Sequence, residues 1–294
     1  MNTQEFGMIA AFLKRRSGLV LTPDKTYLLE SRLSPLVREH GFGGIGEIIA
    51  RACAEPDSKL AVGIVDAMTT NETFFFRDNY PFEALRKPVL PRLMQARAGR
   101  KQLRIWSAAC STGQEPFSIS MMIKDGFPSL SDWRVDIVAT DISRTALSRA
   151  CEGAYSSFEI QRGLPIQYLI KFFEQNGEQW RIKSELLHPI EFRQFDLLWD
   201  LAPLGIFDVI LCRNVLIYFD QQTKAAVLRA MCRQLAPDGV VILGGSESVF
   251  GSCEQLTDVP DLRGVYCHAG SQDLWRAAKP DRKTVAYAQQ RKTA

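Results

Sequence analysis

The 294-residue sequence has no uninterrupted apolar run of membrane-spanning length, so we expect no transmembrane segment. Its N-terminus lacks a basic stretch followed by an apolar one, so we see no secretory signal and expect a cytoplasmic protein. The seven cysteines include no C-x-x-C pair, which argues against a disulfide framework and a zinc site. The three histidines lie far apart in the sequence, so we expect no metal.

A strong charge of one sign is also missing from most of the chain. Residues 269–294 carry six basic and two acidic side chains, a net charge of +4. Because the whole chain has a formal charge of +3, the rest carries only −1. A near-neutral body argues against nucleic-acid binding. A short, mixed basic end is usually solvated, so we expect residues 271–294 to be a basic, disordered tail.

Apolar spacing divides the remaining sequence into two parts. Residues 1–85 have apolar residues at helical intervals and no strand pattern, which predicts a helical domain and linker. Within them, Thr22 and Pro23 indicate the cap and first position of a helix, and Pro35 predicts a bend in that helix. Residues 86–270 alternate short apolar runs with helical segments, which predicts an α/β domain. Its expected parallel strands are 103–106, 135–140, 207–211 and 240–243.

A turn-rich segment at residues 152–190 interrupts this alternation. Its Asn176-Gly177 pair is typical of a tight turn, and residues 180–183 and 190–195 look like short strands. We therefore expect a small β-subdomain inserted in the α/β domain.

The segment 106–116 runs from an expected strand into a tight turn and then into a helix. Gly113 supplies backbone freedom at the bend, and Pro116 suits the first turn of a helix. Cofactors bind where parallel strands of this kind end. The turn has one glycine where the dinucleotide fingerprint has three, so a nucleotide-like cofactor without phosphates fits better.

Two aspartates follow other expected strands. Asp141 lies about 28 residues after Gly113, where a carboxylate accepts hydrogen bonds from ribose hydroxyls in nucleotide-binding folds. An aspartate there could also cap the helix from Arg144, but we favour ribose binding because of the neighbouring turn. Asp196 could accept a hydrogen bond from an adenine amino group. A solvated loop aspartate explains Asp196 about equally well.

The apolar strand at 207–211 is followed by Arg213, Asn214 and Tyr218. Polar groups at a strand's carboxyl end face the ligand crevice of an α/β sheet. The alternative is that Arg213 is paired at the surface and Tyr218 is packed in the core. We favour the crevice because the residues occur together.

Residues 69–77 join the two parts of the chain and combine three phenylalanines with polar side chains. This composition suits a lid over the crevice. The alternative is a hinge in which Thr70 or Asn71 caps a helix and the phenylalanines fill the core between the domains.

Four motifs in this order resemble the chemotaxis receptor methyltransferase family, CheR. They lie at 69–77 (Thr-Thr-Asn-Glu-Thr-x-Phe-Phe-Arg), 108–116 (Ala-Ala-Cys-Ser-Thr-Gly-Gln-Glu-Pro), 139–142 (Ala-Thr-Asp-Ile) and 207–219 (Phe-Asp-x-Ile-x-Cys-Arg-Asn-Val-x-Ile-Tyr-Phe). The resemblance covers about residues 5–268. It implies an α/β fold with a Rossmann-like class I methyltransferase sheet domain, an N-terminal all-helical domain and a small inserted antiparallel β-subdomain. It also implies S-adenosyl-L-methionine as cofactor, S-adenosyl-L-homocysteine as product and no metal.

The resemblance further implies the site residues. Transferred position by position, the cofactor contacts are Asn71, Thr73, Arg77, Glu115, Asp141, Asp196, Leu197, Arg213 and Asn214. Arg77, Arg213 and Tyr218 are the implied catalytic residues, with Arg77 and Tyr218 bordering the methyl-transfer site. The family usually has asparagine in place of Asp196, and both side chains accept hydrogen bonds.

The implied substrate is a glutamate side chain on the cytoplasmic helical region of a chemoreceptor, which becomes a methyl ester. For docking, the family points to the N-terminal helix with Lys25, Arg32 and Arg38, and we select Arg32. A solvated helix face explains these cations nearly as well. Some members also bind a receptor C-terminal pentapeptide through a loop in the β-subdomain. Residues 173–181 look too short for that loop, so we expect a pentapeptide-independent enzyme.

We expect a monomer that neither binds nucleic acid nor inserts into a membrane. Two other functions stay open at this point, because a cofactor domain does not name its substrate. One is methylation of nucleic acid or a small molecule. The other is an adaptor that binds S-adenosylmethionine without turnover, although Arg77, Arg213 and Tyr218 argue against it.

Overall fold

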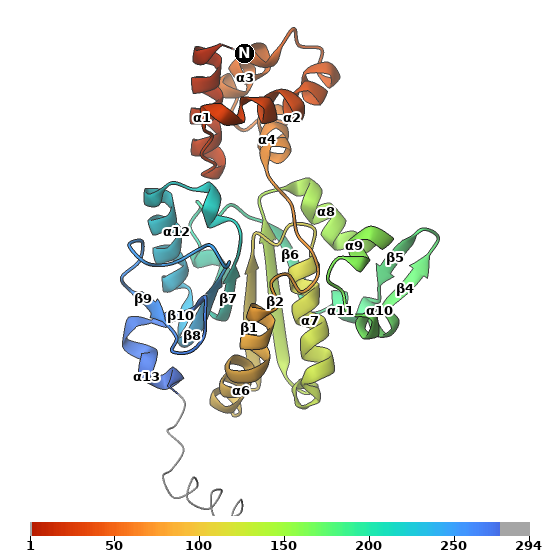
Figure 1. Ribbon diagram of the computed structural model, residues 1–294, viewed down its shortest axis with the longest axis vertical. Helices are drawn as coiled ribbons and strands as arrows, with labels where there is room; N and C mark the ends of the chain where they lie inside the picture. Colours follow the sequence, from red (N-terminus) through yellow and green to blue (C-terminus); the bar gives the residue numbers. More distant parts are fainter. Residues whose placement is uncertain (1, 277–294) are drawn as a thin grey trace, which may run out of the picture.

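The computed structural model describes residues 2–276, which form a helical unit stacked on a larger sheet domain (Figure 1). The helices of the N-terminal unit are α1 (Thr3–Ser17), α2 (Thr26–Glu39), α3 (Ile45–Ala54) and α4 (Lys59–Met68). They bury a shared apolar core that includes Phe12, Leu33, Ile48 and Ile64. The helical spacing of the sequence thus predicts this unit correctly. Within residues 2–276, no helix has both the length and the apolar character needed to cross a bilayer.

The start of α2 differs from the sequence prediction. Thr22 makes no side-chain capping bond, and a short 3-10 turn at Pro23–Lys25 precedes the α-helix, which begins at Thr26. Thr22 thus holds the N-cap position with Pro23 after it, as predicted, but in this 3-10 turn and without a side-chain capping bond. The fixed φ of Pro23 suits this tighter turn as well as an α-helix. Pro35 lies inside α2, which continues past it to Glu39.

A seven-stranded sheet with the order β6-β2-β1-β7-β8-β10-β9 forms the centre of the larger domain. Its strands are β1 (Gln102–Ala108), β2 (Arg134–Asp141), β6 (Ile190–Gln194), β7 (Phe207–Cys212), β8 (Leu235–Leu243), β9 (Leu256–Asp258) and β10 (Val265–His268). The first five strands in this order run parallel, and β10 and β9 add antiparallel pairings. All four predicted parallel strands and the α/β class are confirmed.

Helices cover both faces of this sheet (Figure 1). Side chains alternate between the faces along β1: Ile105 packs in one apolar cluster, whereas Trp106 packs in the other. The first cluster includes side chains of α6 (Leu90–Arg97), α7 (Gln114–Gly126) and α8 (Arg144–Glu152), and the second includes α12 (Gln221–Arg233). A short α5 (Tyr80–Ala84) and a π-helical turn (Leu85–Val89) lead into α6. The sheet is therefore buried on both sides, as its apolar strands require.

A separate three-stranded antiparallel sheet lies in the predicted insertion. It is formed by β3 (Ala154–Ser156), β4 (Phe173–Asn176) and β5 (Gln179–Ile182), with α9 (Ser157–Gln161), α10 (Ile166–Phe172) and α11 (Ser184–Leu187) around it. Asn176 pairs with Gln179 across a two-residue turn of Gly177 and Glu178, one position later than the Asn-Gly pair predicts. Residues 190–195, which the sequence groups with this subdomain, instead supply β6 of the main sheet. Their apolar pattern indicates a strand but not which sheet it joins.

The C-terminal prediction needs one correction. Gln272–Trp275 forms the short helix α13, and Trp275 is buried with the Arg92 guanidinium 5.2 Å from its ring centre. The expected disordered tail therefore begins too early at residue 271. The remainder of that prediction, residues 277–294, lies outside the described residues.

Candidate functional site

A pocket lies between the carboxyl ends of the parallel strands and the helical unit, which contributes Ser17 and Leu19. All ten residues predicted as cofactor contacts or catalytic groups line it: Asn71, Thr73, Arg77, Glu115, Asp141, Asp196, Leu197, Arg213, Asn214 and Tyr218. They come from the 69–77 segment, from the end of β2 and from the segments that follow β1, β6 and β7. The fold thus brings together residues that are up to 147 positions apart in the sequence.

The turn after β1 has a strained backbone that shapes one wall of the pocket. Ala109 and Ser111 have φ values of 58° and 53°, and Gly113 has φ of 92°. Left-handed backbone is uncommon for residues other than glycine and often marks functional sites. At Gly113, an added Cβ would also lie 3.0 Å from Ala150 Cβ, so the turn packs closely against α8. Glycine therefore meets both a conformational and a packing requirement here.

Asp141, at the end of β2, holds the same turn from the side. Its carboxylate accepts hydrogen bonds from the backbone N–H groups of Ser111 (2.7 Å) and Ser143 (2.8 Å). Burial raises the pKa of the Asp141 carboxyl, and these backbone donors offset only part of that rise. The side chain of Ser143, not that of Asp141, caps α8 by accepting from Ala146 N–H. The alternative role of Asp141 as a helix cap is therefore wrong.

Asp196 lies in the pocket wall and is only 7% exposed, so the solvated alternative for it is wrong. One oxygen of its carboxylate accepts a hydrogen bond from the N–H of Leu198 at 2.9 Å. Burial raises the pKa of the Asp196 carboxyl above its ordinary value. The adjacent Leu197 gives this end of the pocket an apolar surface.

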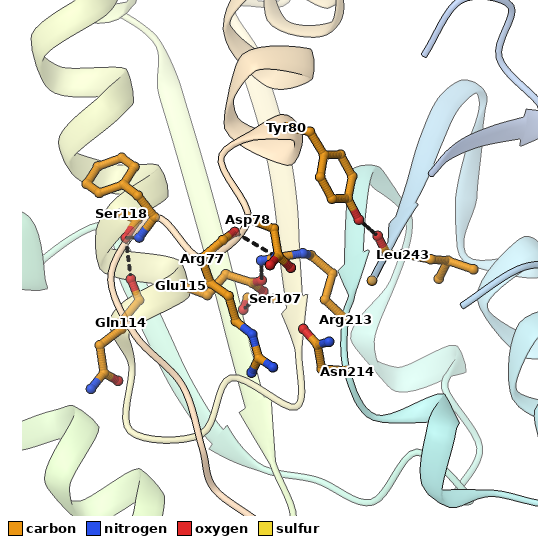
Figure 2. Close-up of polar contacts among 12 residues, drawn as sticks. Arg77, Asp78, Tyr80, Ser107, Gln114, Glu115, Ser118, Arg213, Asn214 and Leu243 are labelled. Atoms are coloured by element: carbon orange, nitrogen blue, oxygen red, sulfur yellow. Dashed lines mark hydrogen bonds and ion pairs between the residues drawn. The ribbon is translucent and has the colours of Figure 1, made fainter. Parts of the chain in front are cut away.

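Arg213 lies at the centre of a buried ionic cluster (Figure 2). Its Nη1 contacts the Glu115 carboxylate at 2.7 Å, and its Nη2 contacts the Asp78 carboxylate at 2.8 Å and the Arg77 carbonyl at 2.7 Å. Burial lowers the pKa of the Arg213 guanidinium, but Glu115 and Asp78 outweigh that effect, so its charge is secure. The side chain is 2% exposed, which overturns the surface-pair alternative. Its Nε is buried without a hydrogen-bond partner in the described residues.

Arg77, unlike Arg213, is held by a backbone carbonyl and an aromatic ring. Its Nη1 donates to the Glu72 carbonyl at 2.8 Å, and its guanidinium lies 5.5 Å from the centre of the Phe74 ring. Arg162 lies 4.7 Å from the same ring centre and pairs with the Glu72 carboxylate at 2.6 Å. Within residues 2–276, no carboxylate forms an ion pair with Arg77. Arg77 is therefore a cation in the pocket wall that is available to an incoming acid.

The segment that carries Arg77 crosses the pocket in non-helical conformation. The next helix starts at Tyr80, so neither Thr70 nor Asn71 caps a helix, and that alternative is wrong. The Asn71 carbonyl instead accepts a hydrogen bond from the Ser111 hydroxyl at 2.7 Å. Phe75 packs edge-on against Tyr155 of the small sheet, not against the helical unit. The arrangement matches the expected lid in position.

Tyr218 lies both in the pocket and against the apolar core, the two environments that the sequence analysis gave as alternatives. It packs beside the apolar cluster under α12 and also lines the pocket. Its carbonyl accepts a hydrogen bond from Val20 N–H at 2.9 Å, which ties this part of the sheet domain to the helical unit.

Arg32, the predicted docking residue, supports the start of the lid segment. Its guanidinium donates to the carbonyls of Met68 (2.8 Å) and Thr69 (3.0 Å) and to the Thr70 hydroxyl (3.2 Å). The sequence shows only a cation on a helix and cannot indicate these acceptors, which lie more than 35 residues away.

Sequence reasoning also missed two members of the Arg213 cluster. Asp78 and Ser107 were not selected, although Ser107 donates a hydrogen bond to Glu115 at 2.7 Å. Asp78 adjoins Arg77, but its left-handed φ of 70° has no signal in the sequence. Among residues 2–276, no group of histidine, cysteine and acidic side chains could hold a metal ion.

Comparisons with known proteins identify the family of this chain. Residues 4–69 match the family model described as "CheR methyltransferase, all-alpha domain", and residues 71–264 match "CheR methyltransferase, SAM binding domain". Chemotaxis protein methyltransferase Cher2 of Pseudomonas putida is 43% identical over 90% of this chain and 98% of its own length. Chemotaxis protein methyltransferase 1 of Pseudomonas aeruginosa is 41% identical over 90% and 96%. This chain therefore belongs to the CheR methyltransferase family.

Proposed function

We propose that this protein uses S-adenosylmethionine to methylate glutamate side chains on the cytoplasmic helices of chemoreceptors, forming the methyl esters used in chemotactic adaptation. The observation that carries this proposal is the single pocket lined by all ten predicted residues, with Arg77 unpaired by any acid in the described residues. The two Pseudomonas relatives are chemotaxis protein methyltransferases, which supports chemotaxis as the setting. We further propose that the enzyme is a cytoplasmic monomer that needs neither nucleic acid nor membrane insertion.

The pocket residues fit S-adenosylmethionine. Asp141 and Asp196 keep unused lone pairs beyond their backbone donors, so they can accept from ribose hydroxyls and from the adenine amino group. The buried, unpartnered Nε of Arg213 is a donor that a bound ligand would complete. When bound, this cofactor supplies an electrophilic methyl group on a positively charged sulfur.

The protein's own contribution is positioning. A glutamate with an ordinary pKa of ~4.3 is ionised at neutral pH, so the enzyme needs no general base to prepare it. We assign Arg77 to orient the incoming carboxylate through its N–H donors and Tyr218 to hydrogen-bond beside it. Arg213, whose charge Glu115 and Asp78 already neutralise, braces the pocket wall and the Arg77 carbonyl. Alignment and exclusion of water then account for catalysis.

A methyl-transfer assay with purified chemoreceptor cytoplasmic fragments tests the proposal. We expect labelled methyl groups to appear on receptor glutamates, to be released by base as esters are, and to be located by mass spectrometry. RNA in place of the fragment should receive no label. Transfer to RNA would establish the nucleic-acid alternative, and cofactor binding without transfer to any fragment would establish the adaptor alternative.

For receptor contact, we propose electrostatic docking through the α2 surface that carries Arg32. Added salt should then weaken methylation, because exposed charge interactions are screened at high ionic strength. Salt-independent methylation would contradict this docking mode. Because Arg32 also holds the lid segment, the salt series is a cleaner test than its substitution.

We also propose that methylation does not depend on a receptor pentapeptide. The hairpin between β4 and β5 closes with two residues, Gly177 and Glu178, which leaves no extended loop there. Titration calorimetry with a receptor C-terminal pentapeptide should show no binding. Low-micromolar or tighter binding would overturn this proposal.

A further inference from the structure

A buried glutamate outside the predicted site holds one wall of the pocket. Glu247 follows β8 and is 8% exposed. Its carboxylate accepts four backbone hydrogen bonds: from Asn214 (2.8 Å) and Gly244 (2.7 Å) at Oε2, and from Val215 (3.0 Å) and Ile217 (3.3 Å) at Oε1. Three of these donors lie between Arg213 and Tyr218. One side chain therefore organises the segment that joins these two pocket residues.

The conformation of this segment explains why it needs such an acceptor. Asn214 has a left-handed φ of 59°, which is uncommon outside glycine and which asparagine tolerates better than most residues. A 3-10 turn follows at Leu216–Tyr218, and the N–H groups at the start of such a turn have no partner within it. A carboxylate satisfies them better than a neutral oxygen, because hydrogen bonds to a charged acceptor are stronger.

The Glu247 carboxylate lies so close to residue 244 that only glycine fits there. A Cβ added to Gly244 would lie 2.5 Å from Glu247 Oε2 and 3.0 Å from the Asn214 nitrogen. Any larger residue would push the carboxylate away from its donors. The contact therefore depends on two residues of the same loop, which makes it testable in two independent ways.

We propose that Glu247 is a positioning residue for methyl transfer: it acts through the backbone of residues 214–217 to hold Asn214 and Tyr218 in the pocket wall. The kinetic part of this inference rests on the proposed methyltransferase function. The structural part does not, because it concerns only contacts within the protein itself.

Glu247→Gln is the direct test. An amide has one accepting oxygen, so its NH2 group would face two backbone donors and break about half of the contact. We expect kcat for receptor methylation to fall by about 10²-fold, the effect of displacing a reacting group by roughly 1 Å. We expect KM for the receptor fragment to stay near its original value, because the docking surface proposed above lies on α2 and not on this loop. Glu247→Asp should recover part of the lost kcat, because it keeps the charged acceptor on a shorter side chain.

Two measurements test Glu247 without a methyl acceptor. In Glu247→Gln, the amides of residues 214, 215 and 217 should exchange hydrogen faster, and S-adenosylhomocysteine should bind about tenfold more weakly, since a lost hydrogen bond has roughly this effect. Both effects stand even if the true acceptor is not a receptor glutamate. A failed receptor assay with these effects present would therefore count against the proposed function and not against Glu247.

Glu254→Gln is the matched control, because Glu254 is exposed in the same loop and the chemical change is identical. It should leave all these measurements unchanged. If Glu247→Gln only lowers Tm, while the folded enzyme keeps its kcat, product affinity and exchange rates, the proposal is overturned. If Glu247→Gln does not fold, Gly244→Ala decides the question: wild-type kcat and exchange rates in that variant would also overturn the proposal.

Discussion

Two buried arginines lie at opposite ends of strand β7 and differ in how many of their guanidinium nitrogens have a hydrogen-bond partner. Arg97 lies near the amino end of β7, where its Nε contacts Asp208 at 2.9 Å and its two Nη atoms contact the two oxygens of Asp238. Arg213 follows the carboxyl end of β7 and also lies between two carboxylates, but its Nε has no partner in the described residues.

The difference separates a structural cluster from a functional one. Every nitrogen of the Arg97 guanidinium has a carboxylate partner inside the protein, and the cluster joins α6 to the sheet. The Arg213 cluster is incomplete and lines the pocket. Native proteins rarely leave buried donors unpaired, so an incomplete cluster at the carboxyl edge of a parallel sheet points to a ligand.

The largest expected effect comes from exchanging each arginine for lysine. In Arg213→Lys, a single ammonium cannot bridge Glu115, Asp78 and the Arg77 carbonyl, so we expect methyl transfer to fall by about 10²-fold or more. In Arg97→Lys, we expect unfolding free energy to fall by about 1–3 kcal/mol, with kcat and product affinity of the folded enzyme unchanged. Denaturant titration and single-turnover kinetics measure the two effects. Equal losses of kcat in both variants, well below their Tm, would remove the distinction.

Arg77 sharpens the comparison, because no carboxylate among residues 2–276 forms an ion pair with it. Since its polar contact is with the Glu72 carbonyl, Arg77→Ala should change unfolding free energy by no more than about 0.5 kcal/mol. Turnover should nevertheless fall by about 10²-fold through loss of orientation. Arg162→Ala is the control, since Arg162 lies over the same Phe74 ring but is paired with Glu72, and its effect on turnover should be smaller. Unimpaired cofactor binding and turnover in Arg77→Ala would refute the assigned role.

The smallest expected effect concerns Asp196. Burial raises its pKa in the folded protein, so the ionised carboxylate destabilises the fold at pH values above that pKa. Asp196→Asn should therefore unfold less readily at neutral pH, and this advantage should shrink as pH falls through the raised pKa. Affinity for S-adenosylhomocysteine should change by no more than about tenfold, because the amide oxygen still accepts a hydrogen bond. Thermal unfolding across pH and calorimetry test both parts, and a variant that is less stable at neutral pH would contradict the first.

Local patterns in the sequence predict much of this molecule. The apolar runs locate β1, β2, β7 and β8, and the Gly113 turn locates the cofactor side of the sheet. Strand ends predict which polar residues meet, because parallel strands place their carboxyl ends at one edge. The same patterns could not show that β6 joins the main sheet and not the small one. Its pairing with β2 depends on residues about 50 positions away in the sequence.

What the sequence alone determined is a set of ten residues that meet at the pocket, some from their places at strand ends and the others from the resemblance to the family's motifs. Only the tertiary structure decided which charged side chains are paired within the protein and which face the pocket. Arg213 and Arg77 look alike in the sequence, but Arg213 meets Asp78 and Glu115, which lie 135 and 98 residues away. Glu247 meets residues some 30 positions before it. Burial and ionic pairing depend on such distant contacts, which local propensity cannot encode.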